Sequence, residues 1–402
     1  IGANPNNLGW FFLLPPLAGL IVQPIIGYYS DRTWAPKLGG RRLPYLLIGM
    51  VIAVIVMILL PNSGSFGFGY GSLAALWFGA ITVAFLDLSS NMAMQPFKMM
   101  VGDMVNDDQK SYAYGIQSLI CNTGAVLAAI FPFLLTWWGV SNTAKKGVVP
   151  QSVVISFYVG AVILVITCLF TIFRVHEYDP ATYARYHGIS EEDNKKGGNW
   201  FTLLKHAPRV FWNVALVQFF CWFSFQYLST YAVGAIAKNV WLTTDASSAA
   251  YQAAGNWYGV MTAVQSIAAV VWSYVLAKVP NNHHKAGYAF SLLLGAIGYT
   301  SIFFIHSQNA LIFSFVLIGI AWASMNTYPL TMVTNALSGK HMGTYLGLFN
   351  GSICVPQMVA SLLSFGLFPL LGSSQVNMML VTGISALLGA ISVLFIKETY
   401  QA

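Results

Sequence analysis

Charged residues are scarce in this chain. Asp, Glu, Lys and Arg make up 8% of its 402 residues, whereas they make up roughly 25% of an ordinary soluble domain. Hydrophobic residues make up 57%, and apolar runs of 18 or more residues recur along the whole length. These runs exclude a soluble domain and are typical of membrane-spanning helices. They also exclude a transmembrane β-barrel, whose strands alternate over about ten residues. The composition predicts an all-α polytopic membrane protein.

Cysteine is sparse as well. Cys121, Cys168, Cys221 and Cys354 each fall in a different apolar run, so they indicate buried thiols rather than a disulfide framework. No CxxC motif or Cys/His cluster occurs, and we expect no metal site and no cofactor. The net charge of +7 does not indicate a nucleic-acid partner, because Lys and Arg collect in the cytoplasmic loops of membrane proteins.

The apolar runs predict eleven spans. Their ranges are 8–30, 43–61, 71–97, 111–139, 151–175, 210–236, 248–277, 286–305, 309–337, 343–370 and 375–396. Sixteen Lys and Arg residues fall in one alternating set of connections, and three fall in the other. The richer set is cytoplasmic by the positive-inside rule, which places the C-terminus in the cytoplasm of a multi-pass protein of the cell inner (plasma) membrane.

A polar segment divides these spans into two groups. Residues 1–175 form an N-terminal bundle with five spans, 176–209 a cytoplasmic linker with an interfacial helix at 200–209, and 210–402 a C-terminal bundle with six spans. Two six-helix bundles would need one more helix, so we expect the first transmembrane helix to be missing from this chain. The segments Tyr114–Cys121 and Tyr345–Cys354 are weakly similar, as in transporters built from repeats.

Asp87 is the one charged residue well inside a predicted span. A carboxylate at that depth costs about 2.5–3.5 kcal/mol on insertion scales, so it marks a functional site by default. A carboxyl group held away from water exchanges a proton closer to neutral pH than one in water does. We therefore expect Asp87 to carry a proton. The alternative is a structural role in capping a broken helix.

Polar residues follow Asp87 at helical spacing. Asn91 and Gln95 lie on the same helix face, which must meet protein or water because lipid cannot satisfy its polar groups. Pro96 is expected to break this helix near its cytoplasmic end, and Asn122 in the next span is a plausible companion. Each amide serves equally well as a substrate contact or as a helix–helix hydrogen bond.

The first cytoplasmic loop carries a motif. An acidic–basic pair is followed by glycine and paired arginines: Gly27, Asp31, Arg32, Gly40, Arg41 and Arg42. This pattern resembles the signature of the major facilitator superfamily, which implies two six-helix bundles, and such a loop can latch their cytoplasmic ends closed. Asp103 is the expected partner of these arginines in that gate. The alternatives are a plain positive-inside anchor and a solvated Asp103.

Longer motifs narrow the resemblance. The segments Val22–Arg32 and Gly40–Tyr45 resemble the sucrose-transporter branch of sugar:cation symporters of the glycoside-pentoside-hexuronide type. Leu86–Met104 and Gly347–Gln357 are most similar to bacterial maltose (α-glucoside) permeases. The resemblance implies sugar uptake, with Asp87 at the position taken as the protonation site in plant sucrose transporters.

Sugars need amides for their hydroxyl groups and aromatic rings for their C–H faces. Gln218 and Trp222 share one helix face in the second half. Further candidates on other spans are Asn256, Trp257, Trp322, Asn326 and Gln357. For each aromatic residue, the alternative is helix packing or the interfacial belt.

These features predict a secondary active transporter that imports a disaccharide, maltose-like or sucrose-like, by proton-coupled symport and alternating access. Sodium coupling and efflux are the alternatives within transport. A polytopic membrane enzyme would need a nucleophile or metal ligands near its paired carboxylates, and none stands near Asp107 and Asp108. We expect a monomer in the lipid bilayer whose partner is a small-molecule sugar.

Overall fold

The computed structural model describes residues 13–62, 73–105, 107–141, 149–187, 200–245, 248–276, 278–279, 283–337 and 342–397. Helices dominate these residues, and no strand is assigned within them. An isolated backbone bridge between Ala35 and Gly40 closes the loop that carries the arginine motif.

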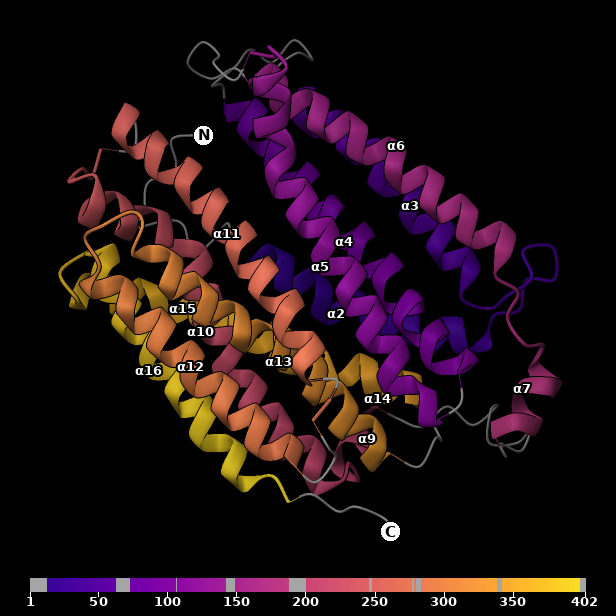
Figure 1. Ribbon diagram of the computed structural model, residues 1–402. Helices are drawn as coiled ribbons and strands as arrows, with labels where there is room; N and C mark the ends of the chain where they lie inside the picture. Colours follow the sequence, from indigo (N-terminus) through magenta and orange to yellow (C-terminus); the bar gives the residue numbers. More distant parts are fainter. Residues whose placement is uncertain are drawn as a thin grey trace.

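The helices form two groups, which Figure 1 shows on opposite sides of the molecule. The first bundle comprises α2 (Leu14–Arg32), α3 (Leu43–Leu59), α4 (Leu73–Met104), α5 (Asp107–Trp137) and α6 (Gln151–Arg174). The second bundle comprises α10 (Arg209–Val240), α11 (Ala249–Leu276), α12 (His284–Phe304), α13 (Leu311–Ala336), α14 (Met342–Phe349), α15 (Gly351–Leu370) and α16 (Gln375–Ser392). The short helices α7 (Pro180–His187) and α9 (Trp200–Lys205) lie between the two bundles in sequence.

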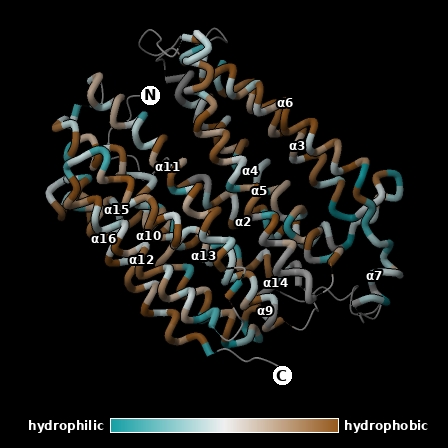
Figure 2. The backbone as a smooth tube through the Cα atoms, in the orientation of Figure 1, coloured by the Kyte–Doolittle hydropathy of each residue, from teal (hydrophilic) through white to brown (hydrophobic). Residues whose placement is uncertain are grey.

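Each of the eleven predicted spans corresponds to a helix or helix pair of the described chain. The span predicted at 8–30 begins outside the described residues, and the span at 343–370 is divided at Asn350 into α14 and α15. Eight of the described helices are long and apolar enough to cross a membrane by length and composition. The others of the eleven, α2, α4 and α10, are the ones that carry many of the predicted polar site residues. Figure 2 shows hydrophobic colour concentrated along α3 and α6 at an outer side of the molecule.

Pro96 does not break its helix. α4 continues through this residue to Met104, so the expected break is wrong. A proline inside a helix removes one backbone hydrogen bond and kinks the helix, but it does not always end it. As a result Lys98, two residues after this proline, belongs to the body of α4.

The two bundles meet along two sets of helices. α5 packs against α11, and α2 packs against α14 and α15. Side chains at the second contact are small: a Cβ atom on Gly347 would lie 3.2 Å from the Cα atom of Pro24, and one on Gly19 would lie 3.0 Å from the Cys354 sulfur. These glycines let the helix backbones approach closely, as small residues do in membrane proteins.

Candidate functional site

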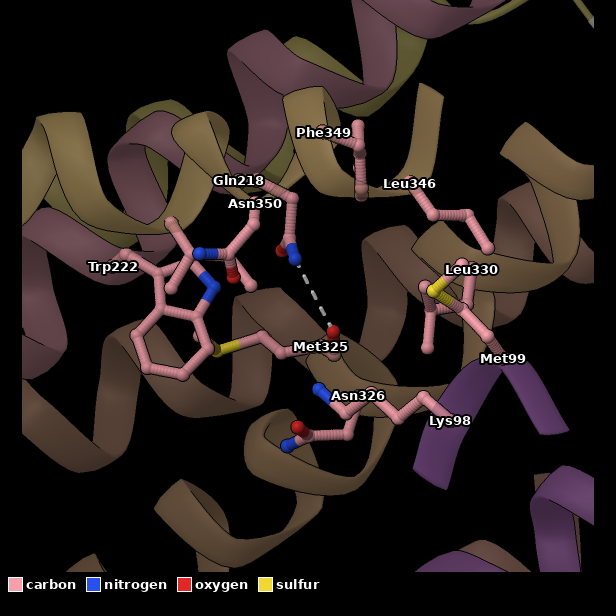
Figure 3. A pocket seen from close by; sticks show the side chains of 11 residues that line it. Lys98, Met99, Gln218, Trp222, Met325, Asn326, Leu330, Leu346, Phe349 and Asn350 are labelled. Carbon is pink, nitrogen blue, oxygen red and sulfur yellow. Dashed lines mark hydrogen bonds between the residues drawn. The ribbon is translucent and has the colours of Figure 1, made fainter. Parts of the chain in front are cut away.

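A pocket lies between the two bundles. The first bundle contributes Lys98 and Met99 of α4. The second contributes Gln218, Trp222, Met325, Asn326, Leu330, Leu346, Phe349, Asn350 and Ile353. Figure 3 shows the Lys98 side chain reaching from α4 toward Asn326, with Gln218, Trp222 and Asn350 farther along the wall. The pocket volume is about 50 Å³, well below the roughly 300–1,000 Å³ of a site that encloses a drug-sized ligand.

Gln218 lines this pocket, but its amide already has partners. Its Nε2 donates to the main-chain carbonyl of Met325 at 3.4 Å, and its Oε1 accepts from the Tyr288 hydroxyl at 3.3 Å. Pro329 lies four residues after Met325 within α13 and has no N–H group, so the Met325 carbonyl lacks its helical partner. Gln218 therefore satisfies a carbonyl that the proline leaves open.

Aromatic side chains stand behind the pocket. Trp222 meets Trp322 edge to face with ring centroids 5.6 Å apart, and Phe225 lies 4.6 Å from Trp322. The Trp222 indole nitrogen is buried and has no hydrogen-bond partner in the described residues. A buried donor of this kind costs free energy until an acceptor reaches it. Trp222 thus combines an apolar ring with an open donor at the pocket wall.

The remaining candidates of the second bundle fall in different places. Asn326 lines the pocket and donates to the Trp322 carbonyl of its own helix at 2.7 Å. Trp257 donates to the Gln308 carbonyl at 2.9 Å, in the connection between α12 and α13, and Asn256 beside it is exposed. Asn256, Trp257, Trp322 and Gln357 are not among the residues that line the pocket.

Asn91, the middle residue of the predicted polar stripe of α4, contacts α2. Asn91 accepts a hydrogen bond from the buried amide of Gln23 on α2 and donates to the Asp87 carbonyl at 2.8 Å. The Asp87 side chain is half-buried. Lys98 follows Asp87 by eleven residues, about three helical turns, so the two share a helix face roughly 16 Å apart along the axis. The Gln95 side chain lies outside the described residues.

Asn122 is buried on α5, although the residues on both sides of it are exposed. It does not line the pocket.

A charged cluster lies at the end of the first bundle. Arg41 and Arg42 donate to one oxygen of Asp103 at 3.0 and 3.1 Å, and the Tyr183 hydroxyl of α7 donates to the other oxygen at 3.0 Å. The Arg41 guanidinium also covers the Tyr183 ring at 3.6 Å. Burial raises the pKa of the Asp103 carboxyl, but the charges of Arg42 and Arg41 outweigh burial and leave this pKa below its ordinary value.

Glu177, just after α6, completes the cluster. Its Oε1 accepts from the backbone N–H groups of Arg42 and Leu43 at 2.8 and 3.2 Å, at the start of α3. A Cβ atom on Gly40 would collide with this oxygen, so a larger residue there would have to displace the Glu177 carboxylate. Burial raises the pKa of Glu177 despite these hydrogen bonds.

The gate prediction thus rests on contacts inside one bundle. Arg41, Arg42, Asp103 and Glu177 tie together the loop after α2, the end of α4 and the segment after α6. None of these contacts reaches the second bundle. Gly27 accepts a hydrogen bond from Ser30 at 3.1 Å, and Arg32 lies 3.5 Å over the Tyr28 ring. The Asp31 side chain lies outside the described residues.

The pocket between two bundles and the arginine loop at one end of them agree with a comparison to protein families. Residues 1–361 match the Major Facilitator Superfamily. The chain belongs to the Major Facilitator Superfamily. Superfamily membership makes it a multi-pass membrane transporter rather than an enzyme.

Several members of this superfamily are similar to the chain. The sucrose transport protein SUC4 of Arabidopsis thaliana is 23% identical over 384 residues, which are 87% of this chain and 75% of that protein. The sucrose transport protein SUT5 of Oryza sativa subsp. indica is 23% identical over 420 residues, which are 90% of this chain and 75% of that protein.

Solved structures of the superfamily share the fold. The proton:xylose symporter XylE matches with a TM-score of 0.67 at 12% identity, over 98% of this chain and 88% of that one. The fucose:proton symporter FucP of E. coli matches with a TM-score of 0.68 at 11% identity, over 98% of this chain and 93% of that one.

Within this superfamily fold, three residues stand out that the sequence patterns did not single out as site residues. Lys98 and Asn350 line the pocket, and Glu177 caps α3. Lys98 lies eleven residues after Asp87, and that spacing could have placed both on one helix face. Asn350 lies inside the motif Gly347–Gln357, which could have drawn attention to it. Glu177 had no comparable signal, because its role depends on contacts with residues far away in sequence.

Proposed function

We propose that this protein imports a disaccharide, maltose-like or sucrose-like, together with a proton. Its pocket carries this proposal, because the pocket lies between two bundles and combines amide, ammonium and indole groups from both. Hydroxyl groups of a sugar need such donors and acceptors, and its C–H faces suit an aromatic wall. The sucrose transport proteins among the relatives and the proton symporters among the similar structures support the same choice.

The two bundles are the moving parts in this proposal. Residues 1–175 and 210–402 rock about the pocket, and residues 176–209 link them on the cytoplasmic side. Alternating access of this kind uses a site at the interface of the two halves. The protein lies in the plasma membrane with its C-terminus in the cytoplasm, as the distribution of Lys and Arg predicts. The loop with Gly27, Asp31, Arg32, Gly40, Arg41 and Arg42 steadies the cytoplasmic end of the first bundle.

Asp87 is the proposed proton carrier. It is half-buried on the helix that also contributes Lys98 to the pocket. Its turn of α4 is joined to α2 through Asn91 and Gln23. Proton binding at Asp87 can thus act on the helix that meets the second bundle. The membrane potential supplies about 2.3 kcal/mol per 100 mV for each proton that enters.

Three pocket residues are the proposed sugar contacts of the second bundle. Trp222 offers its ring and its open indole donor, and Asn326 and Asn350 offer amides. Lys98 offers an ammonium group from the first bundle. Gln218 lies on the same wall, where its amide contacts the Met325 carbonyl and the Tyr288 hydroxyl.

Counterflow in proteoliposomes tests this function. Vesicles loaded with one unlabelled sugar are diluted into a labelled one, over a panel of α-glucosides, sucrose and monosaccharides. Exchange of a disaccharide, and its uphill accumulation under an inward proton gradient, would support the proposal. Accumulation that follows a sodium gradient instead would favour sodium coupling. Outward movement of apolar compounds, with no sugar exchanged, would favour efflux.

A further inference from the structure

Asn350 belongs to the pocket and to the contact between the bundles at once. It lies at the junction of α14 and α15, is 7% exposed, and lines the pocket. Its Nδ2 donates to the Gly19 carbonyl of α2 at 3.4 Å, in the other bundle. The same nitrogen donates to the Cys354 sulfur at 3.2 Å. The contact of α2 with α14 and α15 forms the α2–α15 seam.

Both of these hydrogen bonds are easy to exchange. A side-chain amide has two N–H donors, and here they serve a long bond and a sulfur. A bond of 3.4 Å lies beyond the usual N–H···O range, and sulfur is a weak acceptor. A hydroxyl oxygen of a bound sugar would be a better partner than either.

The rest of the seam is built from backbone and small side chains. Gly347 approaches the backbone of Pro24, and Gly351 lies beside Leu20. Contacts of this kind are close but not directional. The hydrogen bond from Asn350 to Gly19 adds a directional tie between the two helices, and it leads straight to the pocket wall.

We propose that Asn350 couples cargo binding to opening of the α2–α15 seam. Its amide holds α2 while the pocket lacks cargo, and it turns to a cargo hydroxyl when the pocket fills. The seam then loses its directional tie, and the bundles separate on that side. This role rests on the proposed function, because it requires a hydroxyl-bearing cargo in this pocket.

The experiment measures the distance between the bundles directly. Spin labels are placed on Lys37→Cys, in the loop after α2 of the first bundle, and on Lys278→Cys, after α11 of the second bundle; both positions are exposed. Cys121, an exposed native cysteine, is replaced by Ser. Pulsed electron–electron double resonance then gives the distribution of distances between the two labels with and without a transported sugar. Sugar affinity is measured on the same samples.

Asn350→Leu keeps the size of the side chain and removes both donors. We expect the distance distribution of this variant without sugar to shift toward the longer distances that sugar produces in the parent. Adding sugar should then shift the distribution by less than half of the shift seen in the parent. Sugar affinity should fall about tenfold, as expected for one lost hydrogen bond. Asn350→Asp, which also cannot donate when ionised, repeats the test if the leucine variant does not fold.

Asn326→Leu is the matched control. It removes another amide from the pocket, but one that donates within its own helix, to the Trp322 carbonyl. It should weaken sugar binding and leave the sugar-free distances as in the parent. The proposal is wrong if the Asn350 variants keep the parent's sugar-free distribution, or respond to sugar as the parent does. If no sugar binds the parent, the proposed function fails, while the sugar-free distances still report on the tie.

Discussion

Gln218 donates a hydrogen bond to the main-chain carbonyl of Met325, the carbonyl that Pro329 leaves without its helical partner. A side chain on α10 thus supplies the donor that the proline on α13 cannot provide. The pair also fixes the part of α13 from which Asn326 enters the pocket.

We expect Gln218→Leu to destabilise the protein by about 1–3 kcal/mol, because a buried carbonyl loses its donor. Pro329→Ala provides an N–H group that can donate to that carbonyl. The double variant should therefore lose much less stability than the sum of the losses in the two single variants. Thermal unfolding of the parent, the two single variants and the double variant in detergent gives the coupling energy between the two positions. Strictly additive effects would contradict this role for Gln218.

Asp87→Asn should separate coupling from transport. The amide keeps the size and polarity of the side chain but cannot exchange a proton. Uphill accumulation under a pH gradient should fall at least tenfold, while sugar counterflow, which needs no proton gradient, continues. Both are measured in the same proteoliposomes. Accumulation at the parent level would show that Asp87 is not the coupling residue.

Lys98 is expected to act on cargo rather than on the fold alone. Lys98→Met keeps the length of the side chain and removes its ammonium group, so sugar affinity should fall by about tenfold or more. Lys98→Arg, which keeps the positive charge, should retain part of the sugar affinity. Binding titrations measure the affinity, and unfolding temperatures serve as the control. Equal loss of stability in both variants, with affinity unchanged in the folded fraction, would assign Lys98 a structural role.

Asp103→Asn should destabilise the first bundle. It leaves Arg41 and Arg42 without their shared carboxylate in a buried cluster, which costs about 3 kcal/mol. The folded-state pKa of Asp103 is lowered, so its stabilisation is present above the unfolded value of 3.8 and is lost as the pH falls below it. Unfolding temperatures at pH 7 test this, with the exposed Asp245→Asn as control.

Glu177→Gln should have the opposite pH signature. Burial raises the folded-state pKa of Glu177, so the folded state holds this proton more tightly than the unfolded state does. Its contribution is present below the unfolded value of 4.5 and is lost as the pH rises through the folded value. The glutamine still accepts from Arg42 and Leu43, so its unfolding temperature should fall less from pH 4.5 to pH 7. An unchanged pH profile would contradict this account.

The sequence predicts the helical fold well, because long apolar runs leave few alternatives. It also predicts the shared face of Asp87 and Asn91, since helical spacing is a local property. The contact of Asp103 with Arg41 and Arg42 follows from the opposite charges at one end of a bundle.

The rest depends on packing that no local pattern contains. Pro96 suggested a helix end and thereby hid Lys98, but α4 continues across the proline to Met104. Trp257 has the same residue type and helical setting as Trp222, yet one bonds the connection at Gln308 and the other lines the pocket. The rotation of each helix within its bundle decides between these two outcomes.

The walls of the 50 Å³ pocket belong to different bundles, with Lys98 and Met99 facing residues of α10, α13, α14 and α15. A space of this size has room for only a few water molecules. Any guest the size of a disaccharide must therefore push α4 away from its neighbours as it settles. Occupancy and rearrangement then become a single event, and compounds that wedge the walls apart without letting them close again would act as inhibitors.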